Sequence, residues 1–190
     1  MGIFDAFRKE EIAGSKVLVC QLGTAFDDEI RSDLRVYKRF FSTAASAVFS
    51  SVADLRAALG EKYDILHLCC NVDQTGVIAD GAGGRITGSD LLQAAMDSGV
   101  KLLWIANDNS TEAYDAGFKT KGLKINVVLT LRRLGSNTSL FLDNVLSRMA
   151  AGETLSKAWN VASNPEGKSV QPDVPHTISS LGRGGVILLK

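Results

Sequence analysis

Short apolar runs recur along the chain with lengths typical of buried strands. The runs cover residues 16–22, 46–50, 63–70, 101–107, 124–132 and 184–190. They are rich in β-branched residues and too short to be separate helices, so we expect strands. Because they are apolar throughout, without the alternation that marks a strand with one solvated face, we expect a mostly parallel sheet covered on both faces.

The stretches between these runs carry apolar residues at helical spacing. They cover residues 24–41, 51–60, 87–99, 138–151 and 153–162, and a further segment, 110–122, is a short helix or a loop. Thr24 with Asp27, and Ser51 with Asp54, have the spacing of helix N-caps. Gly60 is predicted to end its helix in the left-handed conformation. Strands alternating with helices predict an α/β fold, a three-layer α/β/α sandwich with a mostly parallel sheet of about six strands.

Composition and charge narrow the function. At 190 residues, 45% of them apolar, the chain is long enough for one core, so we expect a single domain over residues 1–190. Its 21 basic and 21 acidic residues cancel without forming a basic block, which argues against nucleic acid as a partner. No apolar run approaches the roughly 20 residues of a bilayer span, and the N-terminus lacks the pattern of a secretory signal. Three cysteines make a poor disulfide framework, so we expect a soluble cytoplasmic protein. We also expect no cofactor.

The first residues form an amphipathic stretch. Ile3, Phe4 and Phe7 can share one face of a helix, while the charged residues around them lie mostly elsewhere. Residues 1–14 are therefore predicted to be an N-terminal extension that docks onto a partner or a second copy of the chain. A helix that packs on its own domain is the alternative.

Polar residues follow three of the predicted strands. They are Asn71, Asp73 and Gln74, then Asn107, Asp108 and Asn109, then Arg132 and Arg133. Ligands of open α/β sheets bind just past the carboxyl ends of the strands, so these positions form a candidate binding rim. Strands also end in Asn and Asp simply because these residues form turns, and that alternative is strong for any single position.

The stretch "YDILHLCCNV", residues 63–72, holds the other chemically notable residues. On a strand, His67 and Cys69 share one face and Cys70 lies on the opposite face. Zinc requires four converging ligands, and the remaining candidates, Cys20 and His176, do not complete a metal motif. Cysteines inside an apolar run are more often inert than nucleophilic. We therefore expect a structural role for this segment, without a metal.

Four pieces of the chain occur in an order that resembles a CHAT domain, a member of the caspase-like peptidase clan. They read "YDILHLCCNV", "GGRITGSDLL", "LLWIANDNS" and "RMAAGETLSKAWNVA", and an apolar "GGVILL" follows them. The resemblance covers about two-thirds of the chain. It implies a caspase-like fold, and in the family a His and a Cys form the catalytic dyad.

The chain departs from the family at both dyad positions. Asn71 stands where the resemblance places the catalytic His, with Val72 in place of the following Gly, and Asn107 stands at the Cys position. His67 matches a non-catalytic His of the motif. An amide has no useful pKa and is not a nucleophile. The resemblance therefore implies a non-catalytic CHAT-like domain, a pseudo-peptidase that acts through protein binding or regulation.

Two other functions remain open from the sequence. A hydrolase of altered mechanism can use Asp73 or Asp108 as a general base with Ser110 or Thr75 beside it, and a raised carboxylate pKa at the rim would mark it. A nucleotide-binding protein is suggested only by "GAGG" at 81–84. That loop lacks the strand–loop–helix context and the lysine of a P-loop, and we expect a flexible turn there.

Overall fold

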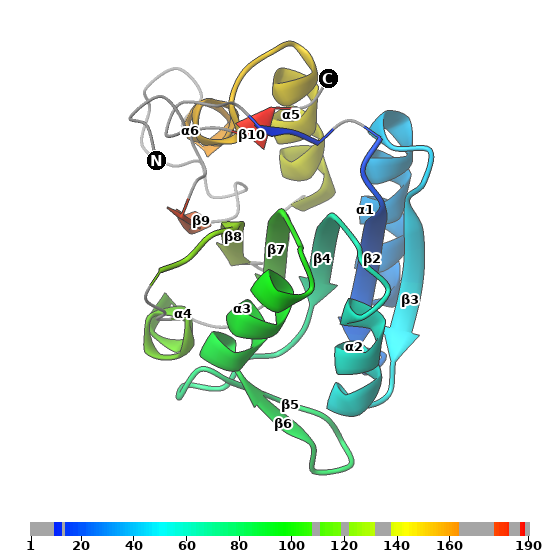
Figure 1. The fold of residues 1–190 in the computed structure, drawn as a ribbon, viewed down its shortest axis with the longest axis vertical. Helices are drawn as coiled ribbons and strands as arrows, with labels where there is room; N and C mark the ends of the chain where they lie inside the picture. Colours follow the sequence, from blue (N-terminus) through cyan, green and yellow to red (C-terminus); the bar gives the residue numbers. More distant parts are fainter. Residues whose placement is uncertain are drawn as a thin grey trace.

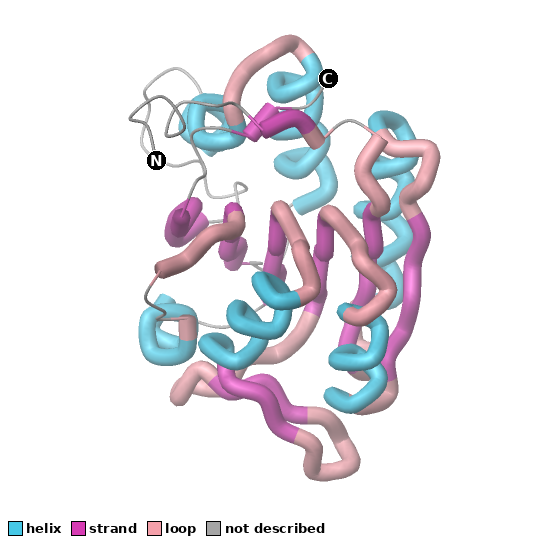
Figure 2. Tube along the Cα trace, in the orientation of Figure 1, coloured by secondary structure: helices cyan, strands magenta, loops and turns pink. Residues whose placement is uncertain are grey.

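A twisted parallel sheet forms the middle of the structure, a computed structural model that describes residues 10–12, 14–107, 111–118, 122–131, 138–163, 177–182 and 187–188 (Figure 2). Five of its strands run parallel, and they are β2 (Val17–Leu22), β3 (Ala45–Phe49), β4 (Ile65–Cys69), β7 (Leu102–Asn107) and β8 (Asn126–Leu131). A sixth, β9 (Thr177–Gly182), pairs antiparallel with β8. The order across the sheet is β3-β2-β4-β7-β8-β9. The predicted α/β class and the mostly parallel sheet are confirmed.

Helices cover both faces of this sheet (Figure 1). They are α1 (Asp27–Phe40), α2 (Val52–Leu59), α3 (Gly88–Asp97), α4 (Thr111–Gly117), α5 (Thr138–Ala150) and α6 (Leu155–Ser163). One core lies between the sheet and α2, α3 and α4, and it takes Leu66 and Leu68 from β4. The other lies between the sheet and α1, α5 and α6, and it takes Ile65 and Cys69 from the same strand. Alternation along β4 thus sends neighbouring residues into different cores, which makes the structure a three-layer sandwich.

Two predicted helix ends differ from the structure. Helix α1 begins after Phe26, which has no capping side chain, rather than at a Thr24 cap. Instead, the Gln21 side-chain carbonyl accepts a hydrogen bond from the Phe26 N–H at 2.8 Å, so a buried strand residue holds the chain entering the helix. Gly60 has an ordinary φ of −64°, and Lys62 takes the left-handed conformation at φ 58°. The cap at Ser51 is confirmed, because its hydroxyl accepts from the Asp54 N–H at 3.1 Å.

The strand pairing near the C-terminus also differs from the prediction. The apolar end of the chain contributes β10 (Ile187–Leu188), which pairs with β1 (Glu10–Glu11) outside the main sheet. The sixth strand of the main sheet is β9, whose sequence TISSLG carries too few apolar residues to have been predicted. Next to β1, Ile12 is buried against the α1 side of the sheet.

A β-hairpin was not predicted either. β5 (Val77–Ala79) and β6 (Arg85–Thr87) pair antiparallel between β4 and α3. The Gly-rich residues 81–84 form the turn of this hairpin, so they do not stand between a strand and a helix as a P-loop requires. This finding removes the structural basis for a nucleotide site there.

Several predicted features fall outside the described residues. Ile3, Phe4 and Phe7 of the predicted extension are among them, as are Asp108, Ser110 and Arg132. Within the described part of the chain, no helix is long and apolar enough to cross a bilayer.

Candidate functional site

Asn71 and Asn107, where the resemblance would place a catalytic dyad, come at the ends of neighbouring strands. In the β4–β7 ladder Cys69 pairs with Ala106, and the Cys70 N–H donates to the Ala106 carbonyl at 3.1 Å. Asn71 follows directly, and Asn107 is the last residue of β7. Both positions therefore lie at the carboxyl edge of the sheet, where the rim was predicted. The Asn71 side chain is exposed, and only the backbone of Asn107 is described.

A cleft opens beside Asn71, between the hairpin and helix α4. Its volume is about 480 Å³, within the roughly 300–1,000 Å³ typical of ligand sites. The residues that line it are Asn71, Val72, Asp73, Gln74, Val77, Ala79 and Ala113. Two amides, one carboxylate and small apolar side chains thus form the walls, and neither Cys nor His is among the lining residues that the structure describes.

The Asp73 carboxylate stabilises the loop between β4 and β5, which lines this cleft. Its Oδ1 accepts hydrogen bonds from the Thr75 N–H at 2.8 Å, the Thr75 hydroxyl at 2.6 Å and the Val77 N–H at 3.0 Å. Its Oδ2 lies 3.5 Å from the Arg85 guanidinium. The Thr75 hydroxyl, the backbone donors and Arg85 lower the pKa of Asp73 from its ordinary value. This is the opposite of the raised pKa expected of a general base at neutral pH.

Close backbone contacts between three glycines fix the loop before the hairpin against α4. A Cβ placed on Gly76 would lie 2.0 Å from the Gly117 Cα, and one on Gly117 would lie 2.4 Å from the Gly76 Cα. Gly76 also has a φ of +78°, which L side chains rarely adopt. The Gly88 N–H, at the start of α3, donates to the Gly76 carbonyl at 3.0 Å. This junction joins the loop before β5 to helix α4, and β5 and α4 both contribute residues to the cleft lining.

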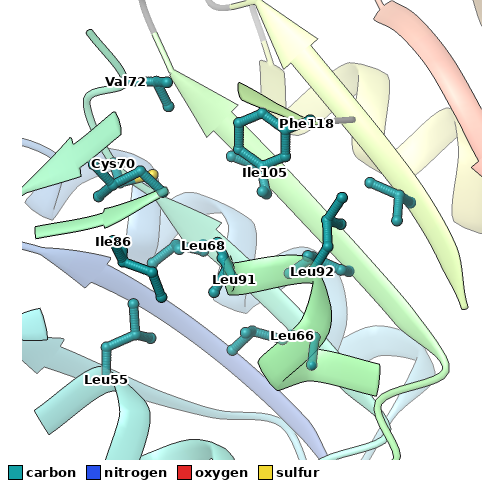
Figure 3. Packing of buried hydrophobic residues seen from close by; sticks show 14 of the residues in the cluster. Leu55, Leu66, Leu68, Cys70, Val72, Ile86, Leu91, Leu92, Ile105 and Phe118 are labelled. Carbon is teal, nitrogen blue, oxygen red and sulfur yellow. The ribbon is translucent and has the colours of Figure 1, made fainter. Parts of the chain in front are cut away.

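The three cysteines lie away from the cleft lining, and all are buried. Cys70 points into the core on the α2 and α3 side of the sheet, among Leu68, Ile86 and Leu91 (Figure 3). Burial raises its pKa to about 12. Cys69 lies in the opposite core, as the alternation of side chains predicted. Its pKa is raised by burial first and then by the charge of Asp33.

A second polar cluster lies within the core on the α1 side. His67 and Asp33 are 2% and 3% exposed, and His67 Nε2 is 3.2 Å from Asp33 Oδ2. The Tyr37 hydroxyl lies 3.2 Å from His67 Nδ1, and the Ser139 hydroxyl donates to Asp33 Oδ1 at 2.7 Å. Asp33, His67 and Cys69 bring an oxygen, a nitrogen and a sulfur within 4.8 Å of one another.

Sequence reasoning missed Asp33, although a signal was present. Asp33 lies three residues after Ile30 and four residues before Tyr37. This helical spacing places its carboxylate on the buried face of α1. A buried carboxylate requires a partner, and the strand that packs beneath the helix carries one of the chain's two histidines.

Comparisons with known proteins do not assign a family. A scan against protein-family models gives no match, and no curated protein matches the chain. The resemblance to CHAT domains therefore remains a hypothesis that rests on the motifs themselves.

Proposed function

We propose that the chain is a non-catalytic CHAT-like domain whose cleft binds an extended segment of a partner protein without cleaving it. The observation that carries this proposal is the lining of the cleft. It has the volume of a ligand site at the sheet edge where α/β proteins bind ligands, yet the described residues that line it include no thiol and no imidazole.

The amides of the lining suit a peptide backbone. Asn71 and Gln74 each offer N–H donors and a carbonyl acceptor, so either can pair with a peptide C=O or N–H. Val77 and Ala79 supply an apolar wall for alternating side chains of an extended segment. Asp73 is paired with Arg85, which leaves the cleft without a strong preference for charged ligands.

The altered hydrolase is less well supported by this geometry. Its candidate base, Asp73, has a lowered pKa. The hydrogen bond that the Thr75 hydroxyl donates to Asp73 lies within one turn, as side-chain bonds of Asp in turns often do. A carboxylate that is more acidic than usual is a weaker base, so it activates a neighbouring hydroxyl poorly.

A selection with randomised peptides tests the proposal. Phage-displayed random dodecamers are selected on the immobilised protein, and enriched peptides are synthesised and titrated by calorimetry. The cleft variant is Ala79→Tyr, which places a bulky ring at an exposed position of β5. The matched control is Ala45→Tyr, at an exposed position of strand β3 outside the cleft lining.

We expect Ala79→Tyr to weaken peptide binding at least about tenfold, equal to roughly 1.4 kcal/mol, and Ala45→Tyr to leave it within about twofold. Mass spectrometry should recover the peptide intact after prolonged incubation. Equal binding by wild type and Ala79→Tyr would place the interaction elsewhere, and fragments absent from a heat-killed control would make the protein a hydrolase.

A further inference from the structure

Three side chains of metal-binding type converge inside the core on the α1 side. Asp33 comes from α1, and His67 and Cys69 come from the same face of β4. All three are at most 3% exposed. The sequence placed His67 and Cys69 on one strand face, and we expected no metal there because too few ligands were evident; the fold brings in Asp33 as a third.

The distance between His67 and Asp33 is that of two ligands of one zinc ion. Two ligand atoms about 2.0–2.1 Å from a tetrahedral zinc lie roughly 3.3 Å apart, given the tetrahedral angle. His67 Nε2 and Asp33 Oδ2 are 3.2 Å apart. Cys69 Sγ, a typical zinc ligand, belongs to the same group, in which one nitrogen of His67, one carboxylate oxygen of Asp33 and Sγ lie within 4.8 Å of one another.

The remote atoms of two ligands are already held. His67 Nδ1 contacts the Tyr37 hydroxyl at 3.2 Å, and the ring stacks on Trp104 at an interplanar angle of 11°. Asp33 Oδ1 accepts from the Ser139 hydroxyl at 2.7 Å. Supporting contacts of this kind orient metal ligands and leave Nε2 and Oδ2 to face the ion.

Nothing else in the described structure satisfies His67 Nε2. Its 3.2 Å contact with Asp33 lacks the alignment of a hydrogen bond, so the buried nitrogen has no hydrogen-bond partner. A cavity of about 10 Å³ adjoins His67 and Asp33, and Thr130 and Thr138 also line it. That volume is close to the space a single water needs.

We propose that Asp33 Oδ2, His67 Nε2 and Cys69 Sγ bind one Zn²⁺ ion, with a water in the adjoining cavity as fourth ligand. One carboxylate and one thiolate neutralise the divalent charge, so no net charge is buried. The thiol proton of Cys69 leaves to solvent when the ion binds. The site ties α1 to the middle of the sheet, and it is separate from the cleft.

Cobalt substitution of the whole chain tests this site. The protein is stripped with a chelator under reducing conditions and titrated with Co²⁺ and then with Zn²⁺. A tetrahedral cobalt–thiolate site gives intense d–d bands and a sulfur-to-cobalt charge-transfer band, both of which Zn²⁺ removes. The ligand variants are Asp33→Asn and Cys69→Ser. Cys70→Ser is the matched control, because Cys70 is equally buried but lies in the opposite core.

We expect about one Zn²⁺ per chain, and Co²⁺ bands that survive in Cys70→Ser and vanish in Cys69→Ser and Asp33→Asn. Ser139→Ala should weaken Zn²⁺ binding about 10- to 100-fold, as loss of a supporting contact does. Zn²⁺ should raise the melting temperature of wild type and Cys70→Ser only. If Cys69→Ser does not fold, the presence or absence of the sulfur-to-cobalt charge-transfer band in the wild-type protein tests the site on its own. Absence of the charge-transfer band in wild type, or its loss in Cys70→Ser, overturns the proposal.

Discussion

The contact between Gly76 and Gly117 gives a sharp prediction about how the cleft is held. Gly117→Ala should destabilise the protein although alanine favours helices. Its Cβ would meet the Gly76 backbone at 2.4 Å, and backbone cannot move aside as the end of a flexible side chain can. Overpacking costs about 1–3 kcal/mol and the upper end applies here, whereas the gain in helix propensity is at most about 1 kcal/mol. We expect a net loss of about 2 kcal/mol.

Two further variants separate the contact from the cost of backbone conformation. Gly83 has a φ of +91° but no heavy atom within 4 Å of an added Cβ. Gly83→Ala therefore carries the left-handed cost of about 1–2 kcal/mol, reduced by a less flexible unfolded chain to about 0.5–1 kcal/mol. Gly76→Ala carries the left-handed cost and the clash, for a loss of about 3 kcal/mol.

Urea titrations followed by circular dichroism measure these differences. For a chain of this length, a loss of 3 kcal/mol lowers the melting temperature by about 6–12 °C. Gly76→Ala and Gly117→Ala should also weaken peptide binding, because they push the loop before β5 away from α4. A Gly117→Ala protein as stable as wild type, or a Gly76→Ala protein no less stable than Gly83→Ala, would refute the reasoning.

Two predictions concern thiols and acid stability. The three buried cysteines should not react with iodoacetamide in the native metal-free protein at pH 8, because burial raises their pKa values. All three should react in denaturant. Prompt labelling of the folded protein would contradict this prediction. Asp64 is partly buried, which opposes ionisation, but the Lys16 N–H at 2.9 Å and the Lys101 ammonium at 2.9 Å lower its pKa overall. Because the native pKa lies below the unfolded value of about 3.9, the ionised Asp64 stabilises the folded protein at pH values above about 3.9. This stabilisation is lost as the pH falls through the native pKa. Asp64→Asn should therefore destabilise at pH 7 and have little effect near pH 2; an equal loss of unfolding free energy at both pH values would contradict the assignment.

The pattern of apolar residues along the chain predicted most of the sheet because β2, β4, β7 and β8 are almost entirely apolar runs. The same rule placed His67 with Cys69 and set Cys70 apart, and both cores follow that division. It failed for β5 and β6, which have three residues each, too few to show a period. It failed for β9 because an antiparallel edge strand need not be apolar on both faces.

Part of the candidate site could also be predicted from the sequence, and part could not. Asn71 and Asn107 could be placed at one edge from the strand pattern, because parallel strands end together. The cleft could not be predicted, since it lies between β5 and α4, and no local pattern encodes the backbone contact of Gly76 with Gly117 that joins these parts of the chain. Asp33 joins His67 only through the packing of α1 on β4.

The central claim is that the cleft binds a peptide and leaves it intact. The most direct measurement is a titration of the ¹⁵N-labelled protein with a selected peptide, followed by NMR and then by mass spectrometry of the recovered peptide. We expect shifts concentrated at the Asn71 and Gln74 side-chain amides and the Val77 and Ala79 backbone, with the peptide at its full mass. Shifts confined to other surfaces, such as the β3 edge, or a peptide recovered as two fragments, would contradict it.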